Sequence, residues 1–180
     1  MNYKNLHFRK VTFLVIFLLV SLSSFSQYRS DRFDEYIKTY KDLAIYQMAK
    51  YKIPASITLS QAILESSAGT SHLAVYGNNH FGIKKKESWH GETIVNPNDG
   101  ELYRKYETIA TSYNDHSLFL TQRPWYKPLF NLSITDYRGW ANGLSKAGYA
   151  TDKAYATKLI RLIETYELYL YDRELLAEKY

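Results

Sequence analysis

Apolar side chains recur every three to four residues along most of the chain, a period typical of amphipathic helices. Ser30 and Asp31 can cap the first such segment, whose apolar positions are Phe33, Tyr36, Ile37, Tyr40, Leu43, Ala44 and Met48. Pro54 ends that segment, and Gly69 and Gly148 stand where later segments stop. The pattern predicts helices over about residues 31–48, 55–67, 113–120, 135–146 and 152–171.

The helical period disappears between residues 77 and 106. Two runs there, Thr93–Val95 and Leu102–Tyr106, have the composition of short strands. The run Asn96–Gly100 between them holds Asn, Pro, Asp and Gly, which favour turns. These signals predict a small β-hairpin lobe on a helical domain. The expected fold class is therefore α+β, mainly α, with a cleft between the lobe and the helices.

The N-terminal segment has the three-part pattern of a secretory signal peptide. Three basic residues, Lys4, Arg9 and Lys10, precede an apolar run over residues 11–22, and small residues lead to Ser26. The apolar run is shorter than the roughly 20 residues that cross a membrane as a helix. No Cys follows it, which argues against a lipid anchor. We expect residues 1–26 to be a cleaved signal peptide and residues 27–180 to form one domain; an uncleaved anchor helix is the alternative.

Charge and cysteine content narrow the class of protein further. The signal segment holds three of the 23 basic residues and none of the 18 acidic ones, so its removal lowers the net charge of +5 by three. Nucleic-acid binding thereby loses its main support. The absence of Cys excludes disulfides and a thiolate nucleophile. The 18 Tyr, 8 Phe and 3 Trp predict an aromatic core and flat faces on which sugars can stack.

Glu65 is the main candidate for acid chemistry. It lies near the end of the predicted helix 55–67, where the helix dipole disfavours a carboxylate, and in apolar and aromatic surroundings. Both effects raise the pKa of a carboxyl above about 4.3, as the proton donor of a glycosidase requires. A Glu on a helix is more often a solvated surface residue, so its position alone is weak evidence.

Sequence motifs around Glu65 strengthen this interpretation. The stretch Ile53–Gly69 and the following Asn79–Lys84 resemble the core of glycoside hydrolase family 73. Later segments agree with that family in order, namely Tyr103–Tyr106, Asp115–Leu120, Gln122–Tyr126 and Gly148–Asp152. The resemblance covers nearly all of residues 35–170. It implies a lysozyme-like fold, N-acetylglucosaminidase activity on peptidoglycan, and Glu65 as the catalytic acid.

The resemblance also implies a second catalytic carboxylate in the β lobe. Asp99 and Glu101, which flank Gly100, are the nearest candidates, and Glu92 is the third. Asp-Gly is also a natural turn pair, so these charges fit a hairpin that has no catalytic role. If neither acts, the N-acetyl group of the substrate could be the nucleophile, which requires one enzyme acid only.

Other positions of the resemblance point to the cleft. Tyr126 matches a family tyrosine, and we expect its phenol to hold the acetamido group or to stabilise developing charge; a buried core ring is the alternative. Asn79, His80, Phe81 and Trp125 are expected to bind substrate, and His80 to pack or stack rather than act as a general base. Together they predict a sugar-binding cleft beside the acid.

Several histidines invite a metal interpretation, namely His72, His80, His90 and His116. Their spacings match no zinc motif, and no Cys is present to complete one. The sequence also contains no phosphate-binding glycine loop and no nucleophile elbow. We therefore expect neither a metal nor a cofactor.

The predicted function is endo-acting hydrolysis of the bond after N-acetylglucosamine in peptidoglycan, by an exported monomer in the periplasm or outside the cell. The expected partner is the glycan strand, with no nucleic acid and no stable membrane anchor after signal cleavage. The second hypothesis is a muramidase or lytic transglycosylase, because these enzymes also use one Glu on a helix. The third is an inactive wall-binding module, since the sequence fixes no second carboxylate.

Overall fold

The computed structural model describes residues 29–174, so the predicted signal segment 1–26 lies outside the described residues. No helix within the described range is both long and apolar enough to cross a membrane. The elements, with η for a 3-10 helix, are α2 (Asp31–Tyr51), α3 (Ala55–Ser66), α4 (His72–Gly77), β1 (Thr93–Val95), β2 (Leu102–Arg104), α5 (Ile109–Thr121), η1 (Pro124–Asn131), α6 (Tyr137–Lys146), α7 (Tyr155–Thr165) and η2 (Leu168–Arg173).

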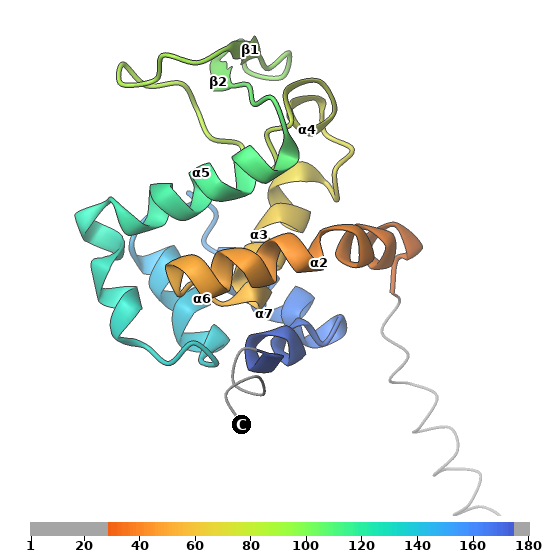
Figure 1. Cartoon of the computed structure of the whole chain (residues 1–180), viewed down its shortest axis with the longest axis vertical. Helices are drawn as coiled ribbons and strands as arrows, with labels where there is room; N and C mark the ends of the chain where they lie inside the picture. The colour runs from red at the N-terminus through yellow and green to blue at the C-terminus, as the bar shows by residue number, and fades with distance from the viewer. Residues whose placement is uncertain (1–28, 175–180) are drawn as a thin grey trace, which may run out of the picture.

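The two strands form the small lobe that the sequence predicts. They pair antiparallel, with Ile94 opposite Tyr103, and Lys84 makes an isolated bridge to Tyr103 on the other side. Gly100 adopts φ +70° in the connecting turn, a conformation that favours glycine. In Figure 1 the lobe lies at the top of the molecule, beyond α5 and α4, and the remaining helices pack below it. The predicted fold class, α+β and mainly α, is confirmed.

Helix α3 is the centre of the domain. Its residues 55–63 are essentially inaccessible to solvent, and α2, α6, α7 and η2 pack around it. A helix enclosed in this way must pair its buried polar side chains internally, as Ser56 does with Asp172 and Gln61 with Tyr155. The core around it is rich in rings, as the composition predicts, and includes Tyr36, Tyr113, Trp140 and Tyr155.

The N-terminus of α3 is capped from the far end of the chain. Asp172 in η2 is fully buried and accepts hydrogen bonds from the backbone N–H of Ser56, at 2.8 Å, and from its hydroxyl, at 2.6 Å. Pro54, the residue before the helix, makes no side-chain cap. Asp172 therefore satisfies an N–H group that would otherwise be unpaired at the start of the helix that carries Glu65.

Asp172 should give folding stability a distinctive pH dependence. Burial raises its pKa from 3.8 to about 6, and the hydrogen bonds from Ser56 oppose that rise. A carboxyl that binds its proton more tightly in the folded state stabilises most below the unfolded pKa, and this contribution is lost as the pH rises through about 6. Between pH 4 and pH 7, the free energy of unfolding of wild type should therefore fall by about 2 kcal/mol relative to that of Asp172→Asn. Urea titrations at the two pH values measure this change. A constant difference would contradict this.

The C-terminal part differs from the single predicted helix over 152–171. Helix α7 begins only at Tyr155 and ends at Thr165, and Glu167 adopts φ +54° before η2 starts. The left-handed residue changes the chain direction, which brings Asp172 to the start of α3. Helix α4 was not expected from the sequence; Ser71 caps it by accepting a hydrogen bond from the N–H of Ala74.

Candidate active site

Glu65 lies in the last turn of α3, as the sequence predicts. The helix ends in an unusual turn in which Ser67, Ala68 and Gly69 all have positive φ. Ser66 holds the turn, because its hydroxyl donates to the carbonyl of Ala62 and accepts from the N–H of Gly69. Two consecutive non-glycine residues in this region store strain, which is often found beside functional side chains.

The Glu65 side chain lines a cavity of about 900 Å³. The cavity lies between α3, the end of α5 with η1, the segment before the β lobe, and the loop after α6. Its volume is ample for a few sugar rings. Its walls are formed by Phe81, Gly82, Ile83, Lys84, Lys86, Phe119, Arg123, Trp125, Tyr126, Ala147, Gly148, Tyr149, Ala150 and Thr151.

Hydrogen bonds fix the orientation of the Glu65 carboxyl. The Tyr155 hydroxyl donates to Glu65 Oε1 at 3.0 Å, and Gln61 Nε2 donates to the same hydroxyl at 3.0 Å. Since the Gln61 amide occupies the acceptor side of Tyr155, the phenolic proton is directed at Oε1. The acid proton of Glu65 therefore belongs on Oε2, which has no such donor.

The surroundings of Glu65 favour its neutral form. Burial raises the pKa of the Glu65 carboxyl, and the hydrogen bond from Tyr155 lowers it to a smaller extent. The dipole of α3 acts in the same direction as burial at this end of the helix. Glu65 thus has the combination of a raised pKa and a free oxygen that a general acid needs.

Aromatic rings line the cavity beside Glu65. Tyr126 and Tyr149 lie 6.2 Å apart between centroids, and Tyr149 stacks on Tyr155 at 5.5 Å. Tyr126 is buried, and burial raises the pKa of its phenol, so it is neutral at pH 7. Trp125 is 54% exposed at the rim, where its flat face is free to stack on a sugar ring.

Of the residues expected to bind substrate, Phe81 and Trp125 line the cavity, whereas Asn79 and His80 do not. The Asn79 amide is buried and bonds the carbonyls of Ile83 and Arg104 as well as the N–H of Ile83. His80 is also buried; its Nδ1 contacts the Tyr36 hydroxyl at 2.5 Å.

Asn79 and His80 are surrounded by other parts of the protein, so they support the local structure and do not face a substrate. Burial lowers the pKa of His80 to about 4, so the ring is neutral, in keeping with the packed role expected for it. The part that these two residues play is to hold the segment before the β lobe in place. Asn79 and His80 therefore support the segment that forms part of the cavity wall and do not line the cavity themselves.

The structure does not bring Asp99 and Glu101 together with Glu65. Asp99 accepts a hydrogen bond from the Tyr103 hydroxyl at 2.7 Å and one from the N–H of Glu101, and neither carboxylate lines the cavity. Glu101 reaches Lys84 at 3.9 Å, and Glu92 pairs with Lys105 at 2.7 Å. Asp99 has the turn and hairpin contacts that its sequence context also allows.

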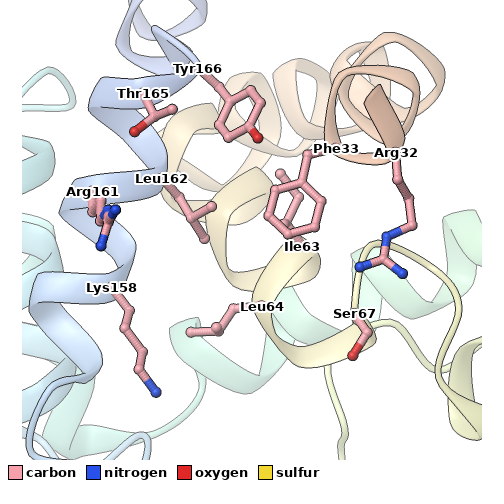
Figure 2. Close-up of a pocket in the computed structure, with 10 residues that line it drawn as sticks. All are labelled: Arg32, Phe33, Ile63, Leu64, Ser67, Lys158, Arg161, Leu162, Thr165 and Tyr166. Carbon is pink, nitrogen blue, oxygen red and sulfur yellow. The ribbon is translucent and has the colours of Figure 1, made fainter. Parts of the chain in front are cut away.

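A separate cavity of about 400 Å³ lies between α2, α3 and α7 (Figure 2). Phe33, Ile63, Leu64 and Leu162 provide its apolar lining, and no Asp or Glu lines it. It therefore offers no acid for glycosidic chemistry. Within residues 29–174, no three His, Asp or Glu side chains gather in a way that would hold a metal ion.

Gln61, Tyr155 and Arg123 belong to the site but were not expected there from the sequence. Tyr155 occurs at helical spacing on the apolar face of α7, which indicates a core position. Its contact with Glu65 spans 90 residues, so no local pattern could have assigned it. Arg123 lies in the motif around Tyr126, and that proximity was the available signal.

An acid of raised pKa in a cavity of this size, on a helical domain with a small β lobe, places the chain among lysozyme-like glycosidases. The chain belongs to the glucosaminidase family, since the family model described as mannosyl-glycoprotein endo-beta-N-acetylglucosaminidase matches residues 41–168. The family membership indicated by the motifs is confirmed.

Individual relatives agree with this membership. The chain is 38% identical over 136 residues to the exo-glucosaminidase LytG of Bacillus subtilis. This aligned region covers 68% of this chain and 48% of that protein. It is 26% identical to the peptidoglycan hydrolase FlgJ of Vibrio parahaemolyticus, over 82% of this chain and 52% of the relative. The chain thus spans about half the length of these relatives.

A solved structure supports the fold over most of the described residues. The catalytic domain of the autolysin Auto from Listeria monocytogenes superposes with a TM-score of 0.68 and 26% identity. The match covers 84% of this chain and 93% of that domain. The two chains therefore share the fold of that catalytic domain.

Proposed function

We propose that this protein hydrolyses the β-1,4 bond that follows N-acetylglucosamine in the glycan strands of peptidoglycan. One observation carries the proposal: Glu65, half-buried and hydrogen-bonded to Tyr155, is the single Asp or Glu that lines the 900 Å³ cavity. Relatives named as a glucosaminidase and as peptidoglycan hydrolases support the choice of polymer.

The chemistry begins with proton transfer from Glu65 Oε2 to the glycosidic oxygen as the C1–O bond breaks. Positive charge then develops on C1 and the ring oxygen. The carbonyl oxygen of the substrate's own acetamido group attacks C1 and forms a cyclic oxazolinium, and we expect the phenol of Tyr126, which lines the cavity, to contact its N–H. Glu65, now a carboxylate, removes a proton from the water that opens this ring, which regenerates the acid.

A single enzyme carboxyl suffices for this route, in accordance with the positions of Asp99 and Glu101 outside the cavity. The alternative is direct participation of Glu101, which would need the β lobe to carry it past its Lys84 contact toward Glu65. Burial and the raised pKa equip Glu65 as the acid of either route. The exposure of Asp99 and Glu101 in the lobe favours the first route.

Mass analysis of digested peptidoglycan tests the assignment. The expected products are muropeptides with N-acetylglucosamine at the reducing end, and strands of several disaccharides should accumulate early, as an endo-acting enzyme requires. Reducing ends at muramic acid would indicate a muramidase, and anhydro-muramic ends a lytic transglycosylase. Early release of terminal units alone would indicate exo action, as the name of the Bacillus relative suggests for that protein. Binding without any product would indicate an inactive wall-binding module.

We further propose that the protein acts outside the cytoplasm, because peptidoglycan lies there and the N-terminal segment has the pattern of a signal peptide. Cleavage near Ser26, the periplasmic or extracellular location, and the monomeric state are parts of the same proposal. N-terminal sequencing of the secreted protein would test the cleavage site.

A further inference from the structure

The wall of the active-site cavity carries an excess of positive charge. Lys84, Lys86 and Arg123 line it, and the single acid on the wall is Glu65, whose pKa is raised. A cleft lined by one sign of charge concentrates ligands of the opposite sign. Polymers of N-acetylglucosamine are neutral, so their sugars alone give no reason for this charge.

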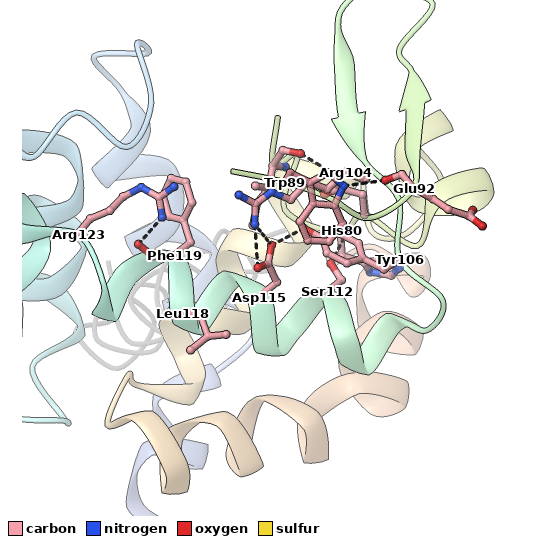
Figure 3. A network of polar contacts seen from close by, with 12 residues as sticks. His80, Trp89, Glu92, Arg104, Tyr106, Ser112, Asp115, Leu118, Phe119 and Arg123 are labelled. Carbon is pink, nitrogen blue, oxygen red and sulfur yellow. Dashed lines mark hydrogen bonds and ion pairs between the residues drawn. The ribbon is translucent and has the colours of Figure 1, made fainter. Parts of the chain in front are cut away.

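Arg123 is the best positioned of these cations. Its Nη1 donates to the carbonyl of Phe119 at 2.9 Å, and its guanidinium covers the Phe119 ring with 3.5 Å to the centroid (Figure 3). These two contacts hold the side chain in place but supply no negative charge. The remaining N–H donors of the guanidinium make no hydrogen bond within residues 29–174. Arg123 is therefore pre-organised to bind a planar anion with two parallel hydrogen bonds.

Several cations of the domain have carboxylate partners. Arg123 and Lys86 have none within salt-bridge distance in the described part of the chain, whereas pairs form at Arg104–Asp115, Lys105–Glu92, Lys158–Asp152 and Lys84–Glu101. Burial, together with the charge of nearby Arg104, lowers the pKa of the Arg123 guanidinium. The nearby charge of Asp115 opposes this shift but is itself paired with Arg104, so a carboxylate bound in the cavity would supply further compensating charge.

Arg123 also joins the active-site cavity to a neighbouring one. It lines both, and the neighbour, of about 560 Å³, is bordered by Lys52 and Lys127 and by no Asp or Glu. Basic side chains therefore lie on both sides of Arg123, in the cavity beside Glu65 and in the one beside α5 and η1. An anionic group attached to a sugar in the cavity would find Arg123 between these two sets of cations.

We propose that Arg123, with Lys86 and Lys84, binds a carboxylate of the peptidoglycan strand, so that the enzyme selects strands that carry free carboxylates over neutral strands of the same glycan. This inference rests on the proposed function and specifies its substrate. Two groups have the required chemistry: the carboxylates of the stem peptides, and the lactyl carboxylate of muramic acid once its peptide is removed. Both lie on the sugar next to N-acetylglucosamine.

The test uses one soluble glycan preparation in three forms: native strands with stem peptides, strands stripped of peptides, and native strands whose carboxylates have been converted to amides. For wild type we expect kcat/KM to fall about tenfold on amidation, the range of one charge-assisted bidentate contact that is partly exposed. The Arg123→Gln substitution should lower kcat/KM about tenfold on native strands and leave it unchanged on amidated strands. Stripped strands identify the source, since they keep the lactyl carboxylate and lack the stem carboxylates.

Matched variants separate binding of the anion from general effects of charge. Lys86→Gln should lose about threefold on native strands alone. Lys85→Gln removes the same charge from the same exposed segment, but Lys85 does not line the cavity, so its kcat/KM should equal that of wild type. A loss for Arg123→Gln that is equal on native and amidated strands would mean that Arg123 only supports the wall, and equal rates of wild type on both would overturn the proposal.

Binding to the inactive Glu65→Gln variant keeps this inference separate from the proposed function. Co-sedimentation with native and amidated strands should favour native strands by about tenfold, and Arg123→Gln in the same background should remove the difference. Preference for native strands without hydrolysis by wild type would refute the proposed function and leave the anion site intact. Hydrolysis by wild type without any preference for native strands would support the proposed function and refute the anion site.

Discussion

Replacement of Glu65 by Gln should reduce hydrolysis of purified cell walls by about 10³-fold while the fold is preserved. Gln keeps the shape of the side chain and can still accept the hydrogen bond from Tyr155, but it holds no proton acidic enough for a glycosidic oxygen. Release of soluble reducing sugar measures the loss. A thermal unfolding midpoint close to that of wild type would show that the loss is chemical.

The lobe carboxylates provide matched controls for this variant. Asp99→Asn and Glu101→Gln likewise replace a carboxyl by its amide, on side chains that do not line the cavity. Under the proposed route their activity should stay within about threefold of wild type. If either lost activity as strongly as Glu65→Gln, that residue would be the second catalytic carboxylate, and the lobe would have to move toward Glu65 during catalysis.

The elements of the fold were largely predictable because their signals are local. The apolar period of α2, the Pro54 break before α3 and the turn Asn96–Gly100 each act within a few residues. The six-residue helix α4 was missed because it is too short to show a period. The end of the predicted helix 152–171 was wrong because the apolar pattern continues across Glu167, where the backbone turns left-handed.

The active site was predictable only in part. Glu65, Tyr126, Phe81 and Trp125 follow from a family motif, and they do line one cavity. Tyr155 orients the acid across 90 residues, and Asp172 caps α3 across 116, so only the folded chain brings them into place. Sequence spacing carries information about neighbours along a helix or strand, whereas these contacts depend on how helices pack.

A charged cluster attaches the β lobe to α5 (Figure 3). Arg104 Nη1 donates to both oxygens of Asp115, at 2.9 and 2.8 Å, and the Tyr106 hydroxyl donates to the same carboxylate at 2.6 Å. The side chains of Arg104 and Asp115 are only 11% and 16% exposed. The backbone N–H of Arg104 also donates a hydrogen bond to the carbonyl of Ile83. The cluster therefore fixes strand β2, which contacts the segment 82–86 of the cavity wall.

Asp115→Ala should lower the free energy of unfolding by about 3 kcal/mol, because it leaves a mostly buried guanidinium without its counter-charge and the Tyr106 hydroxyl without its acceptor. Urea unfolding measures the loss, and Glu92→Ala, which breaks the exposed pair with Lys105, should cause no measurable change.

The paired replacement of Arg104 by Met and Asp115 by Leu distinguishes a buried charge from a positioning role. The double variant should recover most of the stability that Asp115→Ala loses, because no uncompensated charge remains. Its activity should stay low, because the hydrogen bonds from Arg104 to both oxygens of Asp115, which fix β2 on α5, are gone. Relative to wild type, hydrogen exchange in both variants should increase more in residues 83–104 than in α3. If activity returned together with stability, the cluster would serve the fold alone, and the shape of the cavity wall would not depend on it.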